Sequence, residues 1–199
     1  MKTDIMKTEL EKMLSGELYQ VNDERLTSMR RKVKDLITTL NNRYVSFSYE
    51  SFSTIPMPSL GTMLKRLIDN MGENTDIQPP FVCDYGVHIC IGKNVLIKHN
   101  CTISDSAEVT IGDNVIIGPN VALYTSSQSM IASERLEGLE SASPIRIKDN
   151  VCLAGNIVVC PGVTIGENTT IGVGSVVTKD IPANVFAEGN PCVVIKMLQ

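Results

Sequence analysis

An aliphatic residue recurs at every sixth position between residues 147 and 177 of this chain. The series is Ile147, Leu153, Val159, Ile165, Ile171 and Val177. A helix repeats about every 3.6 residues and a simple strand every two, so neither gives a period of six. Short strands joined by tight turns do give it, because the aliphatic residue then faces inward from each successive wall. Six residues on each of three walls predict a triangular parallel β-helix with coils of eighteen residues.

The repeat also extends towards the N-terminus. Ile-Gly pairs occur at 91–92, 111–112, 117–118, 165–166 and 171–172. A β-sandwich would instead need an alternation of period two. The phase shifts by two residues at Ile111, which indicates a small insertion at a corner. We therefore predict a mainly β protein whose β-helix spans residues 75–199 and ends in a short C-terminal segment.

The repeat is lost between Tyr124 and Pro144, where the sequence becomes polar. We predict an excursion loop over residues 124–144. A long polar loop that leaves a regular solenoid is more often functional than structural.

Residues 1–74 read as a helical region with three helical patterns. We expect helix boundaries at Asp4 and Gly16, at Asn22 and Asn42, and at Ser59 and Gly72. Residues 43–58 contain Pro56 and Pro58 and are predicted to be a linker or a surface loop. Three helices of this size should cap the first coil, whose end would otherwise be an open sheet edge. The basic run on the second helix is expected to be a solvated face.

Composition argues against several classes of partner. The net charge is −4, the isoelectric point is about 5.2, aromatic residues make up 5% and Trp is absent. A chain without a basic face or stacking aromatics is not expected to bind nucleic acid. No apolar run approaches eighteen residues and no leader pattern is present, so we expect no membrane partner.

The six cysteines form no C-x-x-C pair, and no cluster of His, Cys and carboxylates has ligand spacing. We therefore expect neither a zinc or redox motif nor any other metal site. Together with the missing leader, this cysteine usage predicts reduced thiols and a cytoplasmic location.

Several motifs together resemble one family. These are EKMLSGELY, GENTDIQPPFVCDYG, NCTISDSAEVTIGDNVIIGPNVALYT, PGVTIGENTTIGVGSVVTKDIPANV and GNP. They are similar to the maltose and galactoside O-acetyltransferases of the hexapeptide acyltransferase superfamily. The resemblance implies a left-handed coil and a homotrimer with acetyl-CoA in the cleft between subunits. It also implies transfer of the acetyl group to the hydroxyl of a small acceptor such as a sugar.

The chain departs from this family at the general base. The family motif reads roughly Tyr-Thr-Ala-Thr-His-Pro, and here the matching residues are 124–129, with Gln128 at the histidine position. A glutamine amide cannot take up a proton at ordinary pH. Losing a general base typically removes a factor of about 10²–10⁴ in rate. Two interpretations therefore stay open: a weakened acetyl-CoA-dependent O-acetyltransferase, or an inactive homologue that binds CoA or a sugar and has a regulatory or scaffold role.

The chain has two histidines, His88 and His99. His99 is a candidate substitute base because it follows an acceptor position of the family. The alternative is an ordinary corner residue, and a catalytic imidazole must be placed to a fraction of an ångström.

The resemblance also assigns binding residues. The acceptor positions correspond to Asp23, Asp84, Lys98 and Ser106, where Lys98 replaces an asparagine and Ser106 an acidic residue. The CoA positions correspond to Gly155, Val173, Thr178, Lys179 and Lys196. Val193 stands where the family has a second basic residue for the nucleotide phosphates, which weakens the expected anion contacts.

Overall fold

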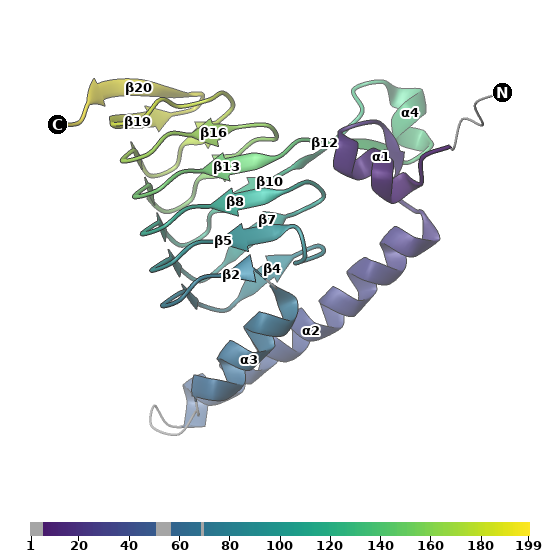
Figure 1. Ribbon diagram of the computed structural model, residues 1–199, viewed down its shortest axis with the longest axis horizontal. Helices are drawn as coiled ribbons and strands as arrows, with labels where there is room; N and C mark the ends of the chain where they lie inside the picture. The colour runs from purple at the N-terminus through teal and green to yellow at the C-terminus, as the bar shows by residue number, and fades with distance from the viewer. Residues whose placement is uncertain (1–5, 51–56, 69) are drawn as a thin grey trace.

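The computed structural model describes residues 6–50, 57–68 and 70–199, with the side chains of 43–50 and 57–60 left aside. The helix boundary expected at Asp4 lies outside the described residues. Short strands stack in parallel into a triangular coil, so the predicted β-helix is confirmed (Figure 1).

The coil has three walls, which the chain visits in the same order in every turn. Wall 1 contains β2 (Asn70–Met71), β5 (Ile89–Ile91), β8 (Val109–Ile111), β13 (Ile145–Ile147) and β16 (Thr164–Ile165). Wall 2 contains β3 (Asp76–Ile77), β6 (Leu96–Ile97), β9 (Ile116–Ile117), β14 (Cys152–Leu153), β17 (Thr170–Ile171), β19 (Val185–Gly189) and β20 (Cys192–Met197). Wall 3 contains β4 (Phe81–Cys83), β7 (Cys101–Ser104), β10 (Ala122–Tyr124), β15 (Val158–Val159) and β18 (Val176–Val177). Because β2 belongs to the first coil, the coil begins ahead of residue 75.

The inward side chains of the hexapeptide series form the core. Leu153, Val159, Ile165 and Ile171 are all fully buried, in one cluster with the aliphatic residues of the earlier coils. Burying this apolar surface is the main force that holds the coils together.

The first coils are longer than predicted. Ile89 pairs with Val109, twenty residues later, whereas Arg146 pairs with Thr164, eighteen residues later. The prediction of eighteen residues therefore holds only for the later coils. The extra residues lie at the third corner, between walls 3 and 1, where the buried residues Ile103 and Val109 are six apart, against four for Val159 and Val163.

Asparagines with left-handed backbone angles turn the other two corners. Asn94, Asn114 and Asn150 have φ values of 56°, 58° and 59°. Asparagine tolerates this conformation better than other residues with a Cβ, because its short side chain bonds locally. The amides also form a ladder, with Asn94 Nδ2 donating to Asn114 Oδ1 at 3.0 Å and Asn114 Nδ2 to Asn150 Oδ1 at 3.1 Å.

Helix α1 (Glu9–Ser15) begins at Thr8, whose hydroxyl and Glu11 form a capping box. It ends at Gly16 in the left-handed conformation (φ 78°), so the predicted stop is confirmed.

Helix α2 (Glu24–Glu50) begins two residues after Asn22 and continues past Asn42. The linker or loop predicted over 43–58 is therefore wrong for residues 43–50, and also for residues 57 and 58, which belong to the next helix. No Gly or Pro occurs within residues 43–50 to end α2 earlier.

Helix α3 (Met57–Leu67) begins before Ser59 and ends well before Gly72. The predicted end was wrong because Met71 pairs with Ile91 in wall 1, and this strand pairing overrides the helical pattern.

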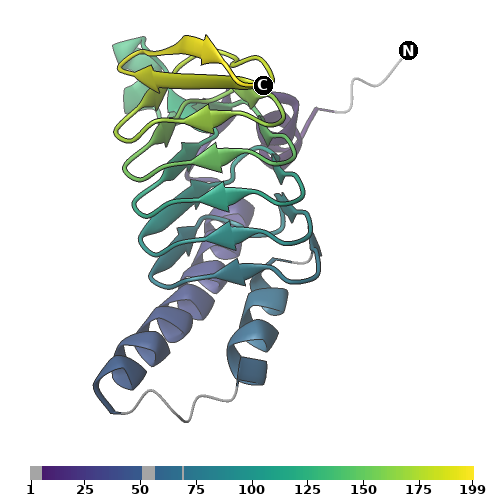
Figure 2. The same cartoon turned by 90° about the vertical axis from the view of Figure 1, so that its left-hand side faces the viewer.

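The long helices α2 and α3 cover the open end of the first coil, as expected (Figures 1 and 2). Val33, Ile37, Leu40 and Leu64 join the apolar core of the coil. Asn41 also exchanges two hydrogen bonds with the backbone of Phe81, at 3.0 and 3.1 Å. Within the described residues, no helix is long and apolar enough to span a membrane.

Helix α1 does not take part in this cap. It lies beside the excursion, which contains β11 (Ser126–Gln128), α4 (Ala132–Leu136) and β12 (Leu139–Ala142) (Figure 1). The short strand β1 (Tyr19–Gln20) pairs with β12 and joins the N-terminal region to the excursion.

Candidate active site

The long third corner gathers polar groups from successive coils. Asp105 is fully buried, and its Oδ1 accepts hydrogen bonds from the backbone N–H groups of Asp84 and Tyr85 at 2.9 and 2.8 Å. Its Oδ2 has no partner among the described residues. Desolvation by burial raises the pKa of the Asp105 carboxyl above its ordinary value. The Ser104 hydroxyl donates to Asp84 Oδ2, which fixes the orientation of the half-buried Asp84 carboxylate.

The excursion adds a small antiparallel sheet in the order β1-β12-β11. Its register places Tyr19 opposite Glu140, and Glu140 opposite Gln128. Residues directly opposite each other in an antiparallel sheet project from the same face with their Cβ atoms about 4.5–5.5 Å apart. Glu140 therefore lies between Tyr19 and Gln128, the residue that the resemblance assigns to the histidine position.

Hydrogen bonds connect this row to the third corner. The hydroxyl of the buried Tyr19 donates to Glu140 Oε2 at 3.1 Å, and the Ser106 side chain also bonds to Tyr19. Burial raises the pKa of Tyr19 well above its ordinary value, so the phenol keeps its proton and remains a donor at neutral pH. Ser106, Tyr19, Glu140 and Gln128 thus form one continuous series, which we call the Glu140 row.

Helix α2 contributes a cation beside this row. Arg30 donates to Tyr85 Oη at 2.6 Å and to the Val21 carbonyl at 2.6 Å, and its guanidinium lies 5.7 Å from the centre of the Tyr85 ring. Tyr85 and Tyr19 belong to the same buried cluster. Arg30 therefore contacts Tyr85, which belongs to the same buried cluster as Tyr19 of the Glu140 row.

The predicted acceptor residues do not all lie together. Asp84 and Ser106 lie at the third corner with the excursion that carries Gln128. Asp23 is instead at the start of α2, where its Oδ1 accepts from the Leu26 N–H at 3.1 Å. Lys98 and His99 lie at the second corner, before β7, whereas the third corner follows β7. Within one chain, His99 is therefore separated from Gln128 by the width of wall 3.

The predicted CoA residues fall into three groups. Gly155 and Val173 lie on adjacent coils at the second corner, where the Gly174 N–H donates to the Gly155 carbonyl at 3.0 Å. Thr178 and Lys179 follow β18 at the third corner. Lys196 is on β20, with its Nζ 6.0 Å from the centre of the Phe186 ring. The three groups therefore lie at the two ends of wall 3 and on β20.

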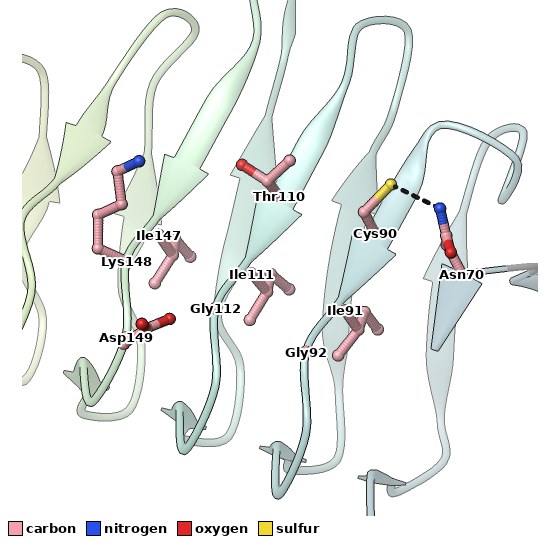
Figure 3. Close-up of a pocket in the computed structure, with 10 residues that line it drawn as sticks. All are labelled: Asn70, Cys90, Ile91, Gly92, Thr110, Ile111, Gly112, Ile147, Lys148 and Asp149. Carbon is pink, nitrogen blue, oxygen red and sulfur yellow. Dashed lines mark hydrogen bonds between the residues drawn. The ribbon is translucent and has the colours of Figure 1, made fainter. Parts of the chain in front are cut away.

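A pocket of about 440 Å³ lies along wall 1, away from these residues. Its lining comes from four neighbouring coils and includes Asn70, Cys90, Thr110 and Lys148 (Figure 3). Asn70 Nδ2 donates to Cys90 Sγ at 3.5 Å. None of the residues assigned from the sequence lines this pocket.

Sequence reasoning missed three residues of the site: Tyr19, Arg30 and Glu140. Tyr19 and Glu140 are 121 positions apart, and their contact depends on the pairing of β1 with β12. A glutamate paired with Gln128 across a hairpin could have been suspected only after the excursion was recognised as two strands. In the described part of the chain, no three His, Cys, Asp or Glu side chains are grouped so that they could hold a metal ion.

Comparison with known proteins gives consistent matches over nearly the whole chain. The maltose acetyltransferase hexapeptide capping motif matches residues 12–60. A maltose O-acetyltransferase from Clostridium difficile is 39% identical, with a TM-score of 0.89 over 97% of this chain and 98% of that one. A galactoside acetyltransferase in complex with coenzyme A is 36% identical, with a TM-score of 0.88 over 98% and 92%. A hexapeptide-repeat acetyltransferase of Vibrio cholerae, in complex with acetyl-CoA, is 31% identical, with a TM-score of 0.84 over 97% and 100%.

Proposed function

Because the chain belongs to the maltose and galactoside O-acetyltransferase family, we propose that it transfers the acetyl group of acetyl-CoA to a hydroxyl of a small acceptor. Relatives with the same fold bind acetyl-CoA or coenzyme A, which supports acetyl-CoA as the cosubstrate. The reaction leaves an O-acetyl ester and free coenzyme A.

The Glu140 row carries the proposal, because it supplies a carboxylate beside the position of the missing histidine. Glu140 is half-buried, and the Tyr19 hydroxyl holds one of its oxygens. A carboxylate can accept the proton of a hydroxyl group, whereas a glutamine amide cannot. We therefore assign the general base to Glu140 and a hydrogen-bonding role to Gln128.

In the proposed reaction, the acceptor hydroxyl passes its proton to Glu140 while its oxygen attacks the thioester carbonyl carbon. The tetrahedral intermediate then collapses, the C–S bond breaks, and the sulfur leaves with the proton that Glu140 returns. The Gln128 amide N–H is suited to binding the negative oxygen of that intermediate. His99 is a weaker candidate for the base, since it lies at the other end of wall 3.

The separate groups of predicted CoA residues support a homotrimer. Gly155 and Val173 lie at one end of wall 3, and Thr178 and Lys179 lie at the other. A neighbouring copy that presented its third corner to the second corner of this chain would bring the two groups to one ligand. The 68% exposure of the Val173 side chain is consistent with such a contact. All six cysteines are free thiols, which supports a cytoplasmic enzyme.

The test is acetyl transfer from acetyl-CoA to a panel of mono- and disaccharides. Product is identified by mass spectrometry, and coenzyme A release is followed against a blank without acceptor, because the chain has free thiols of its own. We expect acceptor-dependent release of coenzyme A and an acetylated product. Binding of acetyl-CoA with no product from any acceptor would instead identify the inactive, CoA-binding homologue that the Gln128 substitution also allows.

A further inference from the structure

A second pocket lies between α2 and the first coil, with a volume of about 490 Å³. Thr27, Arg30, Arg31, Lys34 and Ile37 line it from the helix, and Val82, Cys83 and Asp84 line it from the coil. Thr27, Arg30, Lys34 and Ile37 follow one another at spacings of three or four residues, which places them on one face of the helix. This face of α2 is turned towards the coil. Part of the basic run therefore lines a pocket, whereas the sequence predicted a solvated face.

The cations of this pocket form no ion pair with any side chain that the structure describes. Arg30, Arg31 and Lys34 contribute three positive charges, against one carboxylate from Asp84. Among the described side chains, ion pairs within 4.0 Å are formed only by Lys7 with Glu17 and by Lys12 with Glu9. Three cations around a concave surface without carboxylate partners favour an anionic ligand.

Arg30 is held in place before any ligand arrives. Its guanidinium donates to Tyr85 and Val21 at 2.6 Å each and to Thr27 Oγ1 at 3.4 Å. None of these acceptors is a carboxylate, so the positive charge is oriented but not neutralised. A fixed cation costs little conformational entropy on binding.

Asp84 supplies a different kind of contact in the same pocket. Its Oδ2 accepts from Ser104, and its Oδ1 has no hydrogen-bond partner among the described residues. A free carboxylate oxygen accepts hydrogen bonds from sugar hydroxyls and repels phosphate. The pocket therefore presents cations for an anion at one side and an acceptor for hydroxyls at the other.

We propose that the acceptor is a phosphorylated sugar whose phosphate binds Arg31 and Lys34, with Arg30 as the fixed cation. A phosphate monoester carries a charge of about −1.5 to −2 at pH 7, which suits three cations better than a carboxylate does. Asp84 lines this pocket and also accepts from Ser104 at the third corner, so the pocket shares a residue with the predicted acceptor positions. This inference rests on the proposed function for its reaction, but the binding step can be tested without it.

Binding is tested by calorimetry on the full chain with matched pairs: glucose against glucose 6-phosphate, and galactose against galactose 6-phosphate. We expect each phosphorylated sugar to bind at least tenfold more tightly than its neutral partner, with the preference falling as salt increases. The R31A/K34A variant should lose this preference. The K32A variant should keep it, because Lys32 is an exposed cation of the same helix that does not line the pocket.

Equal binding within each pair, or a preference that survives R31A/K34A, would overturn the inference. The inference would also be overturned if no phosphorylated sugar bound measurably at concentrations up to about 10 mM, because a Kd above that value corresponds to very weak association. If phosphorylated sugars bind through Arg31 and Lys34 but are not acetylated, the inference stands and the proposed function fails. If neutral sugars are acetylated and phosphorylated ones bind no better, the function stands and the inference fails.

Discussion

In the proposed mechanism, Gln128 and Glu140 together take the place of the histidine that the resemblance leads us to expect. An amide at position 128 can donate to the acceptor or to the developing oxyanion, and the carboxylate opposite it can accept the proton. The two roles of one imidazole would thus be divided between two side chains across a hairpin.

Restoring the histidine tests this division. We expect Gln128→His to raise kcat by about tenfold, because an imidazole has a pKa nearer neutrality than a carboxylate and so serves better as a base at pH 7. Gln128→Asn, which restores no base, should give no gain. The measurement is steady-state acetyl transfer with saturating acetyl-CoA. A kcat of Gln128→His at or below the wild-type value would show that position 128 is not beside the reacting hydroxyl.

Asp105 predicts a dependence of stability on pH. Burial raises the pKa of this carboxyl in the folded state above the value of about 3.9 for an unfolded aspartate. The protonated carboxyl therefore favours the folded state. This stabilisation is complete at pH values below the unfolded pKa, and it is lost as the pH rises through the higher pKa of the folded state. Asp105→Asn stays neutral, so its stability relative to wild type should increase steadily as the pH rises from 4 to 8.

Urea unfolding at fixed protein concentration measures this difference. The exposed carboxylate of Asp35 provides the control, and Asp35→Asn should follow the wild-type pH dependence. Parallel curves for Asp105→Asn and wild type would mean that burial does not raise the pKa of the Asp105 carboxyl in the folded protein.

At the level of the element, the corners depend on asparagines in a conformation that most residues avoid. Asn114 has φ 58° and links Asn94 to Asn150 through its amide. Asn114→Ala loses both amide contacts and also pays about 1–2 kcal/mol for a left-handed backbone. Asn114→Gly loses the same contacts without the steric cost. We expect the alanine variant to be less stable than the glycine variant by about 1 kcal/mol in urea unfolding, and the reverse order would contradict the left-handed backbone at position 114.

The elements differ in how far the sequence predicts them. The hexapeptide period predicts the strands because each inward position, such as Ile165, is buried by its own coil and its neighbours. The ends of α2 and α3 were not predictable in this way. Met71 belongs to a strand because Ile91 lies beside it, twenty residues away, and a local pattern does not contain that contact.

The residues of the candidate site also differ in whether the sequence predicts them. The assignment of Gln128 follows from a motif, and those of Asp84 and Ser106 follow from the same family resemblance. Glu140 becomes visible only through the register of β11 and β12, and Arg30 only through its contact with Tyr85, 55 positions away. Long-range pairing of polar residues leaves no periodic signal, so sequence patterns alone do not reveal it.

For the whole molecule, the separation of the predicted CoA residues gives a prediction about assembly. If acetyl-CoA binds between copies, the active species should have three times the 21.7 kDa mass of one chain. Light scattering coupled to gel filtration measures the mass, and dilution measures whether acetyl-CoA affinity falls as the assembly dissociates. A stable monomer that binds acetyl-CoA with full affinity would show that one chain suffices for the cofactor site.

The most direct test of catalysis by the Glu140 row is the kcat of Glu140→Gln with acetyl-CoA and an acceptor that the wild type acetylates. The substitution keeps the size of the side chain and an oxygen for Tyr19, but removes the base. We predict a loss of about 10²–10⁴-fold in kcat, with acetyl-CoA affinity within about twofold of wild type. Glu137→Gln, an exposed glutamate of the same excursion, should leave kcat unchanged. Wild-type kcat in Glu140→Gln would contradict the assignment of the base.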